Sequence, residues 1–277
     1  MNRSNHQQII SLLYTLDIEL IKLLNSLTKE EWNAPTIARK WKVKDIASHI
    51  LDTTFRGLSV SRDNFFGEKA EGIEDYQGLV TFLNKLNMDW TSATARLSPQ
   101  LLISLLQFYG KAFIDHLSTL DPEAPAVFSV AWAGQETSPN WFHIAREYTE
   151  RFLHQQQIRD AVGKQGLMTR EYFFPFIDIL VMALPHTYRN ISAKEGTSVS
   201  VVVTSDIGGT WSIYKKQNGW EFTDSVQEAD ATVSMSPDIA WKLFSKGITP
   251  EEALSQVHIS GNEELALTTL QMVSVMA

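Results

Sequence analysis

The chain has 277 residues, of which 44% are hydrophobic, and its formal net charge is -8 at pH 7. This length accommodates one large or two ordinary domains with a sizeable core. The acidic balance argues against a nucleic-acid-binding protein, because such a protein needs a basic surface to meet phosphates. The chain has no cysteine, which excludes disulfides, thiolate zinc sites and a cysteine nucleophile. Any thiol chemistry would therefore need a thiol from outside the chain.

The sequence shows neither a signal peptide nor a membrane span. Asp17 and Glu19 interrupt the apolar residues near the beginning of the chain. The most apolar later run, 173–184, contains Pro175 and Asp178 and falls short of the ~20 residues that a span requires. We therefore expect a cytoplasmic protein without a membrane partner, whose oligomeric state the sequence leaves open.

Apolar periodicity predicts helices through most of the first part of the chain. The predicted segments are 9–27, 41–66, 76–97 and 99–117, with Gly67 and Gly72 bounding one loop and Ser98 capping the last helix. A long irregular connection follows at 121–140.

The next predicted helix carries the most informative residues of the chain. Ser138 has the side chain of an N-cap, Pro139 suits the first helical position, and Gly163 suits the stop. Together with the earlier segments, this helix predicts a helical bundle.

After Gly163 the pattern changes to that of an α+β domain. A helix at 171–189 precedes alternating segments that predict strands at 198–204, 211–215, 220–222 and 231–235, and Asn218-Gly219 marks a hairpin. Ser236, Thr249 with Glu252, and Gly261-Asn262 mark the starts of short helices. We expect a meander with helices on one face, and domains at 1–167 and 168–277.

Two acid–imidazole pairs lie on the predicted helix 138–163. Glu150 and His154 are four residues apart, so their side chains project from one face and can grip one metal ion. His143 and Glu147 have the same spacing in reverse order, and periodicity does not choose between the pairs. His49, on another helix, is a candidate third ligand, although a histidine satisfied at the edge of the core is the simpler interpretation.

Two stretches resemble the mycothiol-dependent maleylpyruvate isomerase family of the DinB-like metalloproteins. They are Trp41-Lys-Val-Lys-Asp-Ile-Ala-Ser-His49 and the segment 145–160, which contains Glu150-Arg-Phe-Leu-His154. The resemblance implies an N-terminal all-α four-helix bundle that holds a divalent metal, usually zinc, through His49, Glu150 and His154. It thus selects Glu150/His154 over His143/Glu147.

The C-terminal part resembles the second domain of that family, an α+β sterol-carrier-protein-like fold. Gly209-Thr-Trp211, Ala229-Asp-Ala-Thr232 and Met272-Val-Ser-Val-Met276 carry this likeness. With two imidazoles and one carboxylate, the implied zinc keeps a coordination position open, so we expect a catalytic site that activates a low-molecular-weight thiol. The implied activity is thiol transfer to, or isomerisation of, a small organic substrate.

The sequence departs from the family at one point. The family's isomerases use an arginine of the C-terminal domain to engage an anionic substrate, and this chain has no arginine after Arg189. Only lysines remain there, and a lysine cannot clamp a carboxylate bidentately. Maleylpyruvate is therefore not assured as the substrate. Two alternatives stay open: a zinc hydrolase that uses the same ligands, and a non-enzymatic binder of an apolar ligand in the C-terminal domain.

Overall fold

A computed structural model describes residues 6–68 and 76–275, which form two compact units. The helical unit comprises the described residues up to Ser129 together with Thr137–Gly166, and the sheet unit comprises Val130–Glu136 and Leu167–Val275. Gly72 and Met276, named above in a loop and a C-terminal motif, lie outside the described residues. Within these ranges no helix has both the length and the apolar character needed to span a membrane.

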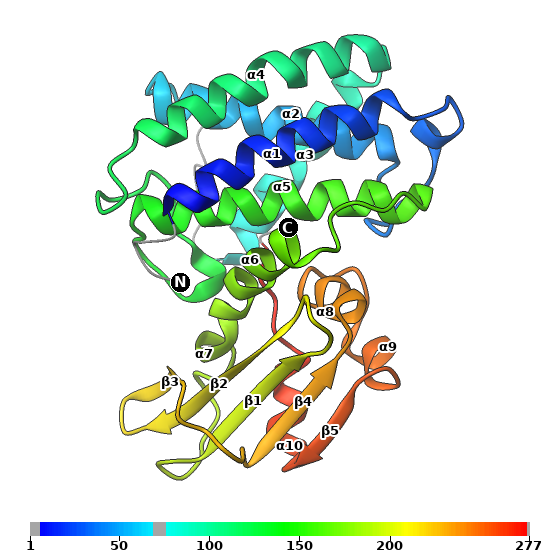
Figure 1. Cartoon of the computed structure of the whole chain (residues 1–277). Coiled ribbons are helices and arrows are strands. Elements are labelled where there is room, and N and C mark those ends of the chain that lie inside the picture. Colours follow the sequence, from blue (N-terminus) through cyan, green and yellow to red (C-terminus); the bar gives the residue numbers. More distant parts are fainter. Residues whose placement is uncertain (1–5, 69–75, 276–277) are drawn as a thin grey trace. The chain divides into compact units, whose positions relative to one another are not determined.

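The helical unit is built on the predicted bundle. Helices α1 (His6–Asn25) and α2 (Val43–Gly57) both pack against α4 (Pro99–Thr119) and α5 (Asn140–Val162), and α3 (Tyr76–Thr94) joins through α2 (Figure 1). Ser98 caps α4 by accepting a hydrogen bond from the amide of Leu101, as the sequence predicts. The N-terminal all-α fold is thereby confirmed.

Helix α2 is shorter than its apolar pattern predicts. The α-helix ends at Gly57 and continues as a π-helical segment, η3 (Leu58–Arg62), instead of running to Phe66. Gly57 lies against α4, because a Cβ added there would stand 2.5 Å from the ring of Phe113. The change of helix type thus begins directly after a residue whose lack of a side chain makes room for Phe113 of α4.

The predicted N-cap of α5 is wrong. The cap residue is Pro139, whose side chain accepts no hydrogen bond. Backbone carbonyls of the preceding loop accept hydrogen bonds from the first amides of the helix instead. Ala124 accepts from the amide of Asn140, and Pro122 accepts from that of Trp141, each at 2.9 Å. At the other end, Gly163 adopts the left-handed conformation expected of a helix stop.

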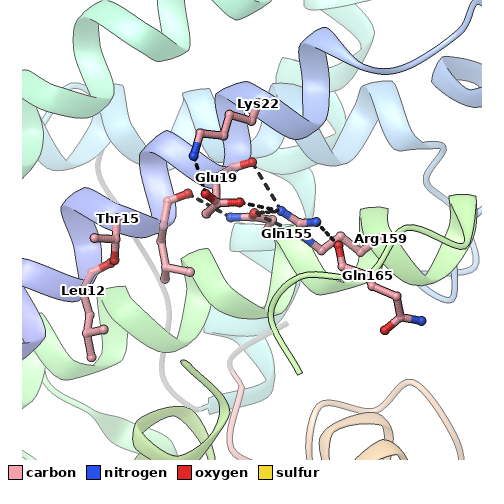
Figure 2. Close-up of polar contacts among 8 residues, drawn as sticks. Leu12, Thr15, Glu19, Lys22, Gln155, Arg159 and Gln165 are labelled. Atoms are coloured by element: carbon pink, nitrogen blue, oxygen red, sulfur yellow. Dashed lines mark hydrogen bonds and ion pairs between the residues drawn. The ribbon is translucent and has the colours of Figure 1, made fainter. Parts of the chain in front are cut away.

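Helix α5 is docked on α1 by buried polar side chains (Figure 2). The Gln155 amide donates to the carbonyl of Leu16 at 3.0 Å. The Arg159 guanidinium donates to Gln155 Oε1 and to the backbone carbonyls of Glu19 and Gln165. Because both side chains are almost fully buried, these bonds fix how α5 lies along α1.

A second buried polar contact joins all four packed helices. Arg151 of α5 donates to the carboxylate of Asp17 on α1 and to the hydroxyl of Thr54 on α2, the latter at 3.0 Å. The Asp17 carboxylate lies over Gly110 of α4, where any side chain would collide with it. Arg151 also stacks over the ring of Phe113, 5.4 Å from its centre.

The sheet unit contains a five-stranded sheet in the order β3-β2-β1-β4-β5. Its strands are β1 (Ser198–Val203), β2 (Gly209–Lys216), β3 (Gly219–Thr223), β4 (Ala231–Met235) and β5 (His258–Gly261). Its helices are α6 (Arg170–Leu180), α7 (Leu184–Thr187), α8 (Pro237–Phe244), α9 (Pro250–Leu254) and α10 (Glu263–Thr269), with short 3-10 segments between α6 and α7 and at Ala131–Ala133. The α+β class is confirmed.

The expected meander holds only for β1, β2 and β3. Strand β4 returns beside β1 in parallel, with Val201 opposite Val233, and β5 pairs with β4. Strand β5 is not evident from the sequence pattern, because it is short and largely exposed. Val199, Ile213 and Val233 are fully buried on one face of the sheet, which α10 and α7 cover.

The ion pair between Asp17 and Arg151 gives a stability prediction. Asp17→Ala leaves the buried Arg151 guanidinium without its counter-charge, so we expect the free energy of unfolding to fall by about 3–5 kcal/mol. Lys85→Ala removes an exposed pair with Asp89 (2.9 Å) and should leave the free energy of unfolding nearly unchanged. Urea unfolding measures both, and equal losses would contradict the role given to Asp17.

Candidate metal centre

The structure brings the three sequence-predicted ligands together inside the helical unit. His49 lies in the middle of α2, and Glu150 and His154 lie one turn apart on α5. The rings of His49 and His154 are 4.7 Å apart, centre to centre, and nearly perpendicular. His154 Nε2 is 3.4 Å from Glu150 Oε2. Helix packing thus joins residues that are about a hundred positions apart in the sequence.

The apolar core sets this register between α2 and α5. Ile46 and Ile50, which flank His49, belong to the same buried cluster as Ile158, one turn beyond His154. Trp41 covers the histidines from the loop before α2, with its ring 4.6 Å from that of His49.

His49 is buried as a neutral imidazole. Burial lowers the pKa of His49 well below its usual value, and the nearby charges of His154 and Arg56 lower this pKa further. Its Nδ1 atom is buried and makes no hydrogen bond. A buried ring nitrogen without a partner costs stability in either tautomer, and in the tautomer with a lone pair on that atom a metal ion can serve as the partner.

Glu150 and His154 form a carboxylate–imidazole contact on the α5 side of the centre. Burial raises the pKa of Glu150, but the hydrogen bond and charge of His154 and the charges of Arg146 and Arg56 outweigh it, so the net pKa is lowered. Gln157 Oε1 lies 2.9 Å from His154 Nδ1, and an amide oxygen only accepts. With the proton on Nδ1, the His154 Nε2 atom carries a lone pair that faces Glu150 Oε2. Two acceptor atoms repel each other unless a second proton or a metal ion lies between them.

Three features of the residues fit a divalent metal: their donor types, the unbonded Nδ1 of His49, and the approach of His154 Nε2 to the Glu150 carboxylate. Two imidazole nitrogens and one carboxylate form a donor set that zinc uses in catalytic sites. Among residues 6–68 and 76–275, no group of three such side chains already stands in the arrangement of metal ligands. Glu150 and His154 contact each other directly, so a metal would have to separate them.

The rival pair, His143 and Glu147, is also buried on α5 but is arranged differently. His143 Nε2 is 3.9 Å from Glu147 Oε1, beyond hydrogen-bonding distance. Glu147 instead accepts a hydrogen bond from Arg146.

Residues 14–159, a little over half of the chain, match the family model described as mycothiol maleylpyruvate isomerase N-terminal domain. The chain belongs to this family. The matched range contains all three candidate ligands, and it confirms the resemblance noted from the two motifs. No curated protein sequence matches the chain.

Two solved structures are similar over nearly the whole chain. The mycothiol-dependent maleylpyruvate isomerase matches with a TM-score of 0.57 at 10% identity, covering 92% of both chains. A histidine-to-alanine mutant of that enzyme matches with a TM-score of 0.58, at the same identity and coverage. At this identity the likeness shows a shared fold. The sterol-carrier likeness of the sheet unit stays a prediction.

Three residues that surround the centre were not predicted from the sequence to belong to the site. Trp41 and Gln157 lie inside the quoted family motifs, and their position beside the histidines was the available signal. Arg146 lies inside the quoted segment 145–160 as well, but a solvated helix face or an ion pair within the bundle explains an arginine there equally well.

The buried His143 gives a pH prediction. Burial and then the charge of Arg146 lower the pKa of His143 to about 4, against Glu147, which raises it. The unfolded chain takes up this proton near pH 6.5. Stability should therefore fall as the pH drops from about 6.5 to about 4, and His143→Asn should remove about 3 kcal/mol of that loss. Urea unfolding at pH 7 and pH 4 with a chelator tests this, and identical losses in both proteins would contradict it.

Proposed function

We propose that the chain is a metal-dependent enzyme that activates a low-molecular-weight thiol for transfer to, or isomerisation of, a small organic substrate. His49, Glu150 and His154 would hold the metal, and zinc suits their donor atoms. The observation that carries the proposal is the position of the buried His49 ring, whose Nδ1 makes no hydrogen bond, 4.7 Å from the ring of His154, which itself contacts Glu150. Membership of the isomerase family supports the same reaction class.

The thiol is proposed from two facts. The chain contains no cysteine, so a nucleophilic sulfur has to be supplied from outside. The similar solved enzyme is described as mycothiol-dependent, and we propose mycothiol or a related small thiol here. A bound zinc ion supplies the lowered pKa that keeps such a thiol ionised at neutral pH.

The chain's own residues prepare the ligands. Gln157 holds the His154 ring through Nδ1 and so keeps Nε2 directed into the centre. Trp41 and the core isoleucines exclude water from one side of His49. Glu150, with its lowered pKa, is a carboxylate at neutral pH and supplies the negative charge that a divalent ion requires.

The substrate stays at the level of a small organic molecule. No arginine follows Arg189, and two of the five later lysines are already paired, Lys216 with Glu221 and Lys242 with Asp238. The alternatives named from the sequence remain predictions. For the apolar-ligand binder, the sheet unit offers a cleft of about 370 Å³ whose lining includes Lys194, Asp230 and Glu264, which favours a polar occupant.

Metal analysis tests the centre. The wild-type protein should bind about one zinc ion per chain with submicromolar affinity. His49→Ala and His154→Ala should each reduce the affinity by 100-fold or more, roughly, because each removes one of three protein ligands. His143→Ala is the matched control, since it removes a buried histidine of the same helix that lies outside the proposed set.

Two results would contradict the assignment. A wild-type protein that binds no divalent metal at micromolar concentration excludes a metal enzyme. Retention of zinc by His154→Ala with loss from His143→Ala would move the site to the rival pair.

Activity assays separate thiol chemistry from hydrolysis. The zinc-loaded protein should transfer mycothiol or another small thiol to an electrophilic acceptor, and His154→Ala should lower kcat/KM by about 100-fold or more, because the metal position is lost. Ester or amide hydrolysis without added thiol, at a rate unaffected by thiol, would favour the zinc hydrolase instead.

A further inference from the structure

Arg146 stands between two carboxylates of its own helix. Its Nη2 donates to Glu147 in a close ion pair, while its Nη1 is 3.9 Å from Glu150 Oε1. Arg146 and Glu150 are four residues apart, a spacing at which an arginine ordinarily pairs with a glutamate. The guanidinium thus donates its hydrogen bond to its immediate neighbour, whereas its contact with Glu150 is a longer ion pair without a hydrogen bond.

This choice matters for the metal centre. An arginine bound bidentately to Glu150 would occupy the oxygens that a metal needs. Its charge would also oppose a divalent cation a few ångströms away, in a region where water screens little, since the Arg146 and Glu147 side chains are only 17% and 9% exposed. Paired with Glu147, the same guanidinium is largely neutralised.

Glu147 makes no closer contact with His143 that would compete with its ion pair to Arg146. It is 3.9 Å from the nearest nitrogen of His143, so its close partner is Arg146. His143 and Glu147, the rival metal pair in the sequence, therefore do not act together. The His143 Nδ1 atom makes no hydrogen bond, and the Glu147 carboxylate binds Arg146.

We propose that Glu147 is a positioning residue that holds Arg146 away from Glu150 and so keeps the Glu150 carboxylate available to the metal. The inference rests on the proposed metal centre and adds a second carboxylate that tunes it without binding the ion. Without Glu147, Arg146 turns to Glu150 and competes with the metal for its oxygens.

A double-mutant cycle tests the proposal through zinc affinity, measured by competition with a chelating dye at pH 7. Glu147→Gln should weaken zinc binding about tenfold, the scale of lost contacts around a metal's ligands. Arg146→Gln should strengthen binding, because it removes the positive charge that remains 3.9 Å from Glu150 in the wild type. Adding Glu147→Gln to Arg146→Gln should then change the affinity less than about twofold. Asp89→Asn, in an exposed ion pair of α3, controls for net charge and should leave the affinity unchanged.

The outcomes separate this proposal from the one on which it rests. If the wild-type protein binds no zinc, both fall. If the wild type binds zinc and Glu147→Gln binds it equally well, or if the loss is the same with and without Arg146, the positioning role alone is overturned. Far-UV circular dichroism of the metal-free variants reports their folding. Should Glu147→Gln fail to fold, Arg146→Gln still decides, because misfolding cannot raise the affinity.

Discussion

The buried ion pair between Asp17 and Arg151 is the contact on which the helical unit depends. It links α1 to α5, reaches α2 through Thr54, and rests on α4 where Gly110 leaves room for the carboxylate. A pair of this kind does not have to add net stability, since desolvation offsets much of its attraction. It does penalise every other packing of these helices, because any shift strands a charge in the core. Glu150 precedes Arg151 directly, so the same contact sets the height of the proposed metal centre.

The centre is also balanced in charge by residues of the same helices. Arg56 is paired with Asp52 on α2, and Arg146 with Glu147 on α5, so each cation near the histidines has its own carboxylate. Glu150 is thereby left as the acidic group that faces His154. This arrangement explains how two arginines can lie close to a site that is proposed to take up a divalent cation.

Much of this could be predicted from the sequence, and the failures have physical causes. Periodicity located the bundle helices, and the family motifs selected His49, Glu150 and His154, which the fold brings together. The cap of α5 could not be predicted, because its first amides donate to the carbonyls of Pro122 and Ala124, which lie far back along the loop before the helix. The pairing of β4 with β1 and the short strand β5 depend on tertiary contacts that alternation does not encode. The preference of Arg146 for Glu147 over Glu150 is likewise set by the packed neighbours, since helical spacing favours the opposite choice.

The docking of α5 on α1 has a consequence for sequence divergence. Gln155 and Arg159 bind main-chain carbonyls of Leu16 and Glu19, groups that every amino acid carries (Figure 2). Substitutions along much of α1 therefore leave these bonds intact, provided that the helix and its buried face persist, whereas the ion pair of Arg159 with the Glu19 side chain, at 3.6 Å, depends on the residue in α1. Relatives can drift far apart in α1 while α5 keeps its glutamine and arginine. A search for distant members should weight those two side chains above the residues they touch.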